Sequence, residues 1–312
     1  MYKTERITDD SYNDIQFLYL ECFKMLRSHD FIKTKYYTKS FGLRNVGVLA
    51  KSDTAELAGF YGVFPIILNY ENKDILVAQS GDTMTSPNHR KKGLFIKLAK
   101  ETYELAESLD VKLVFGFPNK FSFPGFKKKL NWSFYGCMQT YVIEVFTLPI
   151  CEIVSKISKL KPLYDKFIAY NLKKYLVPIE KINYELFNQT KVKGLIKKNE
   201  TFFRYKLQKN NVYVIEMDGV QVLMKVDDHL IVGEIGATKE VGSGKVIYVV
   251  KKLAKKLGCK KVIFNLSPNH WLSEVLSGEL SAKEGLPIGF YSMSDDIDCQ
   301  DIQFSNADFD TF

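Results

Sequence analysis

The chain has 312 residues, of which 46% are hydrophobic and 14% aromatic, and its formal net charge is +8. This is the composition of a folded protein with a core, and the length suits two ordinary domains. The first residues are charged and no apolar run approaches about 20 residues, so we expect neither a signal peptide nor a membrane-inserted helix, but a soluble, cytoplasmic protein. Five cysteines without metal-like spacing predict no disulfide framework and no metal site.

The positive charge comes mostly from lysine. It suits anionic small ligands, although a lysine-rich surface without such a role is an equally good interpretation. The sequence contains no arginine stripe and no nucleic-acid motif, so we expect no nucleic-acid partner. The oligomeric state cannot be predicted from these features.

The N-terminal part begins with a helix and continues with an antiparallel meander. Residues 14–28 have helical apolar periodicity, and strands are expected at 46–50, 57–64 and 75–78. After the helix come His29 and Asp30, and then an aromatic, basic run that includes Tyr36. This segment is either a partly buried capping segment or part of a substrate pocket.

The next strand is unusually polar. Central strands are normally rich in Val, Ile and Leu, whereas residues 79–83 read Gln-Ser-Gly-Asp-Thr. Burying unpaired polar groups costs about 1–3 kcal/mol each, so we expect this stretch, including Gln79, to line a wet cleft. Asp82 is its only carboxylate, and it is either a proton acceptor or a structural acceptor for loop amides. His89 is the second candidate base and is expected to be exposed beside the following loop.

A basic loop and an amphipathic helix follow this strand. Arg90, Lys91, Lys92 and Gly93 precede a helix over 94–109, whose apolar residues fall on one face. The first amide groups of a helix lack partners and carry the positive end of its dipole, and glycine allows a ligand to approach the backbone closely. The pattern therefore predicts a phosphate site.

The spacing Arg90-x-x-Gly93 between strand and helix resembles the pyrophosphate loop of the GNAT acyltransferase superfamily, with Phe95 in place of a second small residue. Asn119 and Ser122, after a predicted strand at 111–117, match the start of the family's next helix. The resemblance implies that the loop amides hold the pyrophosphate of coenzyme A and that the preceding strand pairs with pantetheine. The implied cofactor-binding residues are Thr83, Met84, Thr85, Arg90, Lys91, Lys92, Gly93, Leu94, Phe95, Asn119 and Ser122.

Acyl transfer to an amine requires a base that removes a proton from the acceptor. We predict Asp82 for this role, with His89 second. Many family members have a tyrosine acid seven residues after the matched Asn, but here that position is Phe126. A tyrosine acid at that point is excluded.

The second half of the chain repeats the first. A strand at 229–237, a helix at 246–257 and a strand at 261–266 follow the same order, and Gly93 and Asn119 correspond to Gly242 and Asn269 at nearly one offset. The predicted fold is thus α/β with a mixed sheet, built as two tandem GNAT-like domains. The predicted segments are a CoA-binding domain over 1–148, a helical connector over 149–199 and a degenerate domain over 200–312.

The second half is interpreted as a degenerate copy that supplies the other wall of the acceptor cleft. Lys239 replaces Arg or Gln in its loop, and Glu240 puts an anion where a phosphate would lie. No helical pattern is evident beyond Asn269. The last residues, 302–312, are either an exposed acidic tail or an ordered strand that contacts the acceptor.

As a whole, the chain resembles the tandem-GNAT sugar N-acyltransferases of bacterial surface-polysaccharide pathways. The resemblance implies transfer of an acetyl or short hydroxyacyl group, such as 3-hydroxybutanoyl, from acyl-CoA to the amine of a dTDP- or UDP-linked amino-deoxy sugar. Such a product would serve lipopolysaccharide O-antigen or capsule synthesis, with direct attack in a ternary complex. The alternatives are an aminoacyl-tRNA-dependent transferase of the peptidoglycan-bridge type and a non-catalytic GNAT-like interaction module.

Overall fold

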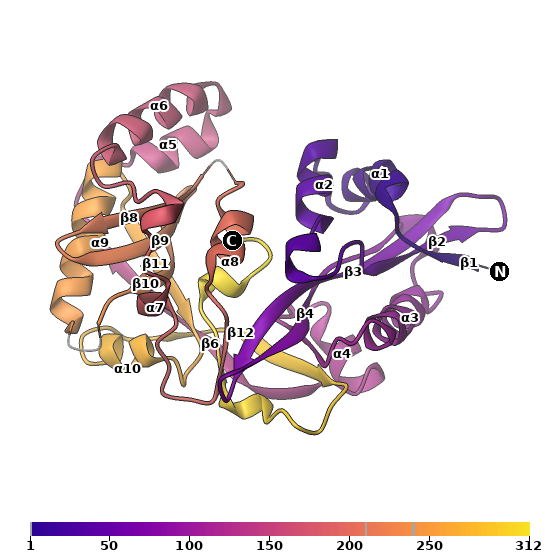
Figure 1. Cartoon of the computed structure of the whole chain (residues 1–312). Helices are drawn as coiled ribbons and strands as arrows, with labels where there is room; N and C mark the ends of the chain where they lie inside the picture. Colours follow the sequence, from indigo (N-terminus) through magenta and orange to yellow (C-terminus); the bar gives the residue numbers. More distant parts are fainter. Residues whose placement is uncertain (1, 210, 239–240) are drawn as a thin grey trace. The chain divides into compact units, whose positions relative to one another are not determined.

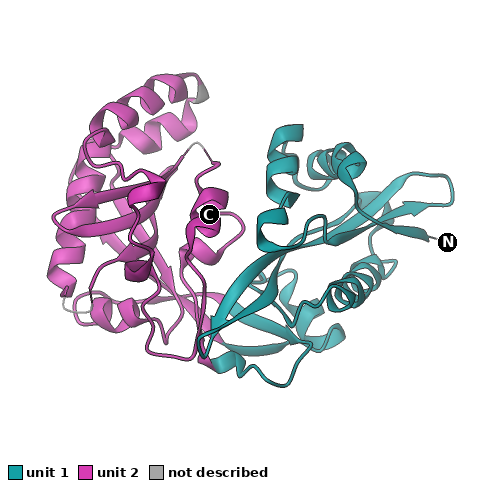
Figure 2. Cartoon of the chain, viewed as in Figure 1, with its two compact units in different colours: residues 1–135, 287–300 teal, residues 136–286, 301–312 magenta. Residues whose placement is uncertain are grey.

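The computed structural model describes residues 2–209, 211–238 and 241–312. The chain divides into two compact units, shown in Figure 2: unit 1 comprises 1–135 and 287–300, and unit 2 comprises 136–286 and 301–312. The division differs from the predicted segments because β12 (Lys283–Ser292) returns to unit 1, where it pairs antiparallel with β5 (Leu113–Gly116). The predicted mixed α/β fold is confirmed.

The sheet of unit 1 starts as an antiparallel meander and then becomes mixed. Each of the first four strands pairs antiparallel with the next, and the fourth pairs parallel with β5. This order agrees with the predicted antiparallel meander within a mixed sheet. The four strands of the meander are β1 (Tyr2–Arg6), β2 (Gly47–Ser52), β3 (Leu57–Tyr70) and β4 (Lys73–Thr85).

Helices cover both faces of this sheet. On one face lie α1 (Tyr12–Phe23) and α2 (His29–Tyr36), and on the other lie α3 (Leu94–Ser108) and α4 (Phe123–Lys129), as Figure 1 shows. The two faces carry separate apolar cores, because apolar side chains recur at helical spacing on α1 and α3 and alternate between the faces of β3.

A bulge in β4 sets the geometry of this unit. The register between β3 and β4 shifts so that Tyr61 faces Thr83 while Val63 faces Ser80, which leaves one extra residue on β4. In the described part of the chain, the ladder between β4 and β5 ends at Gln79. Beyond this point β4 continues beside β3 to its end at Thr85, and the two parallel strands separate.

In unit 2 the strands β6, β11, β10, β9 and β8 are neighbours in that order, with parallel and antiparallel pairs. Its strands are β6 (Ser133–Glu144), most of which lies in this unit, β7 (Gly194–Ile196), β8 (Val212–Met217), β9 (Val220–Val226), β10 (Leu230–Gly236), β11 (Lys261–Leu266) and β13 (Ile302–Gln303). Its helices are α5 (Ile150–Lys156), α6 (Lys161–Leu172), α7 (Tyr184–Phe187), α8 (Glu200–Lys206), α9 (Ser243–Leu257) and α10 (Trp271–Ser277).

The repeat is visible in the secondary structure, since β10, α9 and β11 follow the order of β4, α3 and β5, with β10 parallel to β11. The expectation of no helix beyond Asn269 is wrong: α10 begins where His270 Nδ1 accepts the backbone N–H of Leu272, and Trp271 is buried. The C-terminal segment is not an exposed tail, because Asp308 is fully buried. Lys239 and Glu240 lie outside the described residues.

Candidate active site

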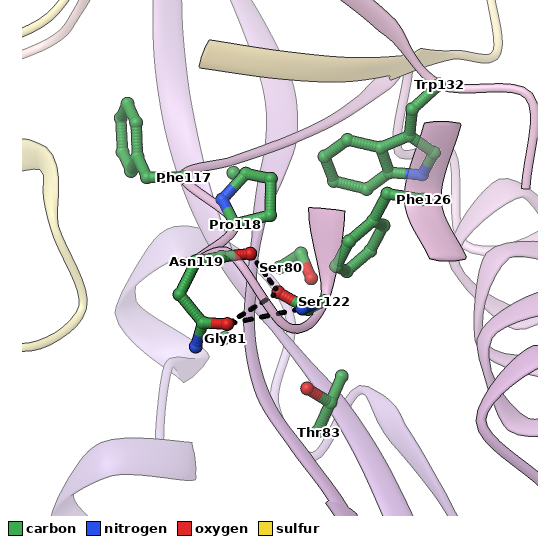
Figure 3. Close-up of a pocket in the computed structure, with 10 residues that line it drawn as sticks. Ser80, Gly81, Thr83, Phe117, Pro118, Asn119, Ser122, Phe126 and Trp132 are labelled. Atoms are coloured by element: carbon green, nitrogen blue, oxygen red, sulfur yellow. Dashed lines mark hydrogen bonds between the residues drawn. The ribbon is translucent and has the colours of Figure 1, made fainter. Parts of the chain in front are cut away.

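A cavity opens in unit 1 where β4 and β5 separate. Its volume is about 110 Å³, and β4, the segment after β5 and the start of α4 line it. Figure 3 shows these side chains around the cavity. We call it the inner cavity, and its lining residues are Ser80, Gly81, Thr83, Gly116, Phe117, Pro118, Asn119, Ser122, Phe126 and Trp132.

A larger hollow of about 730 Å³ continues from the inner cavity along the end of β4 to the start of α3. Thr83, Asn119 and Ser122 line both. We call the larger hollow the outer groove, and its lining residues are Cys22, Phe23, Phe60, Tyr61, Thr83, Met84, Thr85, Arg90, Phe95, Leu98, Asn119, Phe121, Ser122 and Gly125.

The structure therefore brings seven of the predicted cofactor residues together. Thr83, Met84, Thr85, Arg90, Phe95, Asn119 and Ser122 line the outer groove. Lys91, Lys92 and Gly93 are exposed on the loop before α3, and Leu94 is 2% exposed and packs in the core. Leu94 can thus present only its backbone to a ligand.

Gly93 begins α3 in a left-handed conformation, with φ of 76°. A Cβ atom at this position would meet nothing within 4 Å, so the backbone conformation rather than space favours glycine here. The first turn of α3 contains no acidic residue. The 15-residue helix thus directs its positive end toward the groove at which Arg90 lies.

Two of the predicted cofactor residues make contacts within the protein that shape this site. Asn119 Oδ1 accepts the backbone N–H groups of Phe121 at 2.9 Å and Ser122 at 3.2 Å, so this side chain shapes the turn before α4. Phe95 fits in place of a small residue because Gly125 lies beside it: a Cβ there would be 2.6 Å from Phe95 Cε1. The Phe95 ring also packs edge-on against Phe126.

Asp82 lies at the bulge of β4 but its carboxylate is held by three donors. Lys35 Nζ lies 2.8 Å from Oδ1, while the hydroxyl groups of Tyr36, at 2.6 Å, and Tyr19 both donate to Oδ2. Burial, and next the charge of Asp82, raise the pKa of Tyr19 well above its usual value, which keeps this donor protonated. The donors are side chains rather than the loop amides that we had considered.

His89 is buried rather than exposed, contrary to expectation. Only 7% of the residue is accessible, and it lies beside a separate hollow that Glu56 and Ser86 also line. Its Nδ1 lies 3.0 Å from the Tyr2 hydroxyl, and its Nε2 lies 3.4 Å from Glu56 Oε2. Both ring nitrogens thus have partners that fix the segment before α3.

The comparisons with known proteins agree with this geometry. The family model described as an acetyltransferase (GNAT) domain matches residues 3–135. Residues 3–135 therefore resemble a GNAT acetyltransferase domain, and this resemblance supports an N-acyltransferase enzyme. No curated protein matches the chain by sequence.

Solved structures share the fold across both units. A GCN5-related N-acetyltransferase from Kribbella flavida aligns over 94% of this chain and 72% of its own, with 13% identity and a TM-score of 0.63. A probable N-acyltransferase from Enterococcus faecalis aligns over 94% and 73%, with 10% identity and a TM-score of 0.60. N-myristoyltransferase from Saccharomyces cerevisiae, with bound myristoyl-CoA, aligns over 93% and 78%, with 10% identity and a TM-score of 0.59.

The predicted acceptor residues of the GNAT domain do not gather at one place. His29 and Asp30 are exposed in the first turn of α2, whereas Tyr36 is buried at its last turn and donates to Asp82. Gln79 is 5% exposed and pairs with Phe115 in the ladder between β4 and β5. Of these four, Tyr36 and Gln79 therefore have structural partners next to the bulge.

Sequence reasoning missed a buried chain of polar side chains behind the inner cavity. Trp132 Nε1 donates to the Tyr103 hydroxyl at 3.0 Å, and Tyr61 lies 2.8 Å from Tyr103 and 2.7 Å from Ser80 Oγ. A buried indole N–H and buried phenols need partners, but the sequence did not indicate which residues would supply them. The partners come from β3, β4, α3 and the segment after α4.

Among the described residues, no group of three or more His, Cys, Asp or Glu side chains could hold a metal ion. None of the helices in the described ranges has the length and hydrophobicity to span a lipid bilayer. Enzymes with GNAT domains use acyl-CoA, and the outer groove, which runs along the end of β4 to Arg90, has a lining that suits this ligand.

Proposed function

We propose that the GNAT domain binds acyl-CoA along β4 and transfers the acyl group to an amine. The observation that carries this proposal is the separation of β4 from β5 beyond Gln79. A strand whose neighbour has ended offers backbone donors and acceptors to an extended ligand, as in binding by strand addition. Residues 83–85 would pair with pantetheine, and the start of α3 at Gly93 would hold pyrophosphate.

The size of the inner cavity supports a short acyl group. Its volume is about 110 Å³, against about 730 Å³ for the outer groove. Because the acyl group would occupy the smaller of the two spaces, we expect an acetyl group or a short hydroxyacyl group such as 3-hydroxybutanoyl rather than a long acyl chain.

For the acceptor we propose the amine of a dTDP- or UDP-linked amino-deoxy sugar, used for surface-polysaccharide synthesis such as O-antigen or capsule. The tandem arrangement resembles sugar N-acyltransferases, and the net charge of +8 suits an anionic nucleotide-linked substrate. An aminoacyl-tRNA donor would not need the Arg90-x-x-Gly93 loop. A non-catalytic module would have no use for the polar lining at Ser80 and Thr83.

Isothermal titration with acetyl-CoA tests the donor site through a matched pair of variants. Asn and Asp both tolerate the left-handed backbone of Gly93, so Gly93→Asn and Gly93→Asp differ mainly in charge. We expect Gly93→Asp to bind acetyl-CoA at least about tenfold more weakly than Gly93→Asn, which corresponds to about 1.4 kcal/mol. A negative charge at the start of α3 opposes the pyrophosphate.

Gly242→Asp is the control for the second half, because a Cβ there also meets nothing within 4 Å. It should bind acetyl-CoA like the wild type. Weaker binding only in Gly242→Asp would place the cofactor in the second half of the chain. No binding by the wild type would refute acyl-CoA as the donor. With the donor established, mass spectrometry of acetyl-CoA incubated with UDP- and dTDP-linked amino sugars tests the acceptor against simple amines.

A further inference from the structure

The inner cavity is backed by the chain Trp132, Tyr103, Tyr61 and Ser80, with successive distances of 3.0, 2.8 and 2.7 Å. Tyr61 and Tyr103 are fully or nearly fully buried, at 0% and 2% exposure. The two ends of this chain, Ser80 and Trp132, line the inner cavity together with Phe126 (Figure 3). The hydroxyl end of a buried polar chain is therefore open to the place where β4 and β5 separate.

The indole fixes the direction of this chain. Trp132 Nε1–H can only donate, so the Tyr103 oxygen accepts it. Among the described residues, the Tyr61 oxygen is then the acceptor that remains for the Tyr103 proton. Were Tyr61 to donate to Tyr103 instead, the buried Tyr103 proton would lack an acceptor, at a cost of about 1–3 kcal/mol. Tyr61 then donates to Ser80 Oγ, and the Ser80 proton remains for the cavity.

The phenols hold this direction over the physiological pH range. Burial raises the pKa of Tyr61 and of Tyr103 well above the ordinary value of a tyrosine. Both hydroxyl groups therefore stay protonated and continue to donate toward Ser80.

We propose that Ser80 Oγ donates a hydrogen bond to the thioester sulfur and stabilises the departing thiolate, with Tyr61, Tyr103 and Trp132 as positioning residues. This rests on the proposed acyl-CoA function. The amine nitrogen bonds to the carbonyl carbon, the C–S bond breaks and its electron pair stays on sulfur. The proton lost by the amine goes to water, and Ser80 keeps its own proton while its hydrogen bond strengthens.

The other polar groups of the inner cavity are less suited to this role. Phe126 has no hydroxyl, and Ser122 Oγ donates to the carbonyl oxygen of Asn119 at 3.3 Å. Asn119 Oδ1 accepts two backbone N–H groups, which leaves the Nδ2 amide of this side chain as a further donor at the cavity. Thr83 and the Asn119 amide are the remaining competitors, and a rise that is kept in Ser80→Ala would point to one of them.

The test compares the product CoA with desulfo-CoA, which lacks the sulfur, in titrations from about pH 7 to about pH 10. A donor next to the sulfur lowers the pKa of the bound thiol, so CoA binds more tightly once its thiol ionises. We expect the affinity ratio of CoA to desulfo-CoA to rise about tenfold for the wild type, equivalent to one pKa unit. Lysine titration affects both ligands and cancels in the ratio.

Ser80→Ala should bind desulfo-CoA normally, which shows that it is folded, and its affinity ratio should rise less than about twofold. Tyr103→Phe interrupts the chain behind Ser80 and should reduce the rise to about threefold. A wild-type ratio that does not change with pH, or a full rise in Ser80→Ala, would overturn the proposal. A rise lost in Thr83→Val but kept in Ser80→Ala would assign the donor to Thr83 instead. Failure of the wild type to bind either ligand would refute the CoA site itself.

Discussion

The two halves of the chain build the same strand, helix and strand but treat the end of the first strand differently. In unit 1 the inner cavity lies between the separating strands β4 and β5. In unit 2, β10 bulges at Gly233, and Asn306 Nδ2 donates to the carbonyl oxygen of Val232 at 3.2 Å. Ser267 N–H donates to the Phe304 carbonyl oxygen at 2.8 Å, so the C-terminal segment occupies this region.

Each bulge carries a glycine followed by an acid, and each acid pairs with a lysine. Asp82 is 11% exposed, with Lys35 at 2.8 Å, whereas the Glu234 side chain is 1% exposed, with Lys198 at 3.6 Å. Lys198 also lies 2.9 Å from Asp308. Burial acts to raise the pKa of Glu234, but His270 and Lys198 outweigh it and lower it to about 2.

This difference shows how one framework serves two purposes. In unit 2 the charged group ties the C-terminal segment to β10, and this segment occupies the position that corresponds to the inner cavity of unit 1. In unit 1 the charged group joins α1 and α2 to β4, while the other side of β4 is left to the inner cavity. A glycine followed by an acidic residue therefore identifies the β-bulge in each half and does not by itself indicate a catalytic site.

The largest effect is expected from removing the lysine of unit 2. Lys198→Met leaves Glu234 and Asp308 without their ammonium group in a fully buried place. Breaking a buried ion pair in this way costs about 3–5 kcal/mol. Urea unfolding followed by circular dichroism should show this loss in the free energy of unfolding.

Lys35→Met is the matched variant in unit 1 and should cost clearly less. Asp82 keeps two phenolic donors, from Tyr19 and Tyr36, and is more exposed than Glu234. Equal losses in the two variants would contradict the distinction between a sealed and a partly open site.

The glycines of the two bulges give a second, smaller comparison. A Cβ at Gly81 would overlap the ring of Phe64, and a Cβ at Gly233 would overlap that of Phe312. Phe64 lies within β3 and is packed against Tyr36, so it cannot yield. Overpacking of this kind costs about 1–3 kcal/mol, and we expect that loss for Gly81→Ala.

Gly233→Ala should cost less than Gly81→Ala, because a Cβ at Gly233 would lie 2.3 Å from the nearest Phe312 atom, whereas a Cβ at Gly81 would lie 2.0 Å from Phe64. The double variant Gly233→Ala/Phe312→Ala tests whether the clash is the cause. Differential scanning calorimetry of the three variants ranks the losses. A larger loss for Gly233→Ala than for Gly81→Ala would show that the Phe312 ring yields less than the Phe64 ring.

Local patterns predicted the framework of the site. Helical periodicity identified α3, and the glycine before it indicated where the helix begins. Alternation and turn residues identified the meander, and the unusual polarity of residues 79–83 predicted a cleft that Ser80, Gly81 and Thr83 do line. Each of these features depends on residues close together in the chain.

What could not be predicted depends on distant partners. The burial of His89 depends on Tyr2, which lies 87 positions away. The point at which the ladder between β4 and β5 ends depends on the register of β3 and β4. The return of β12 to unit 1 depends on its pairing with β5. Long-range contacts of this kind leave no periodic signal in one sequence.

The smallest effect concerns Asp82, whose role as the base stays a prediction. The Asp82 carboxylate already accepts hydrogen bonds from an ammonium and two phenols, and these donors come from α1 and α2. We expect Lys35→Met/Asp82→Asn, which removes both charges together, to lower kcat less than about tenfold, or about 1.4 kcal/mol. The shape of the pH–rate profile, measured by acetyl-CoA consumption with the best acceptor from the screen, should not change. A fall of about a hundredfold or more together with loss of the acidic limb would identify Asp82 as the general base, because a structural pair has no proton to take from the amine.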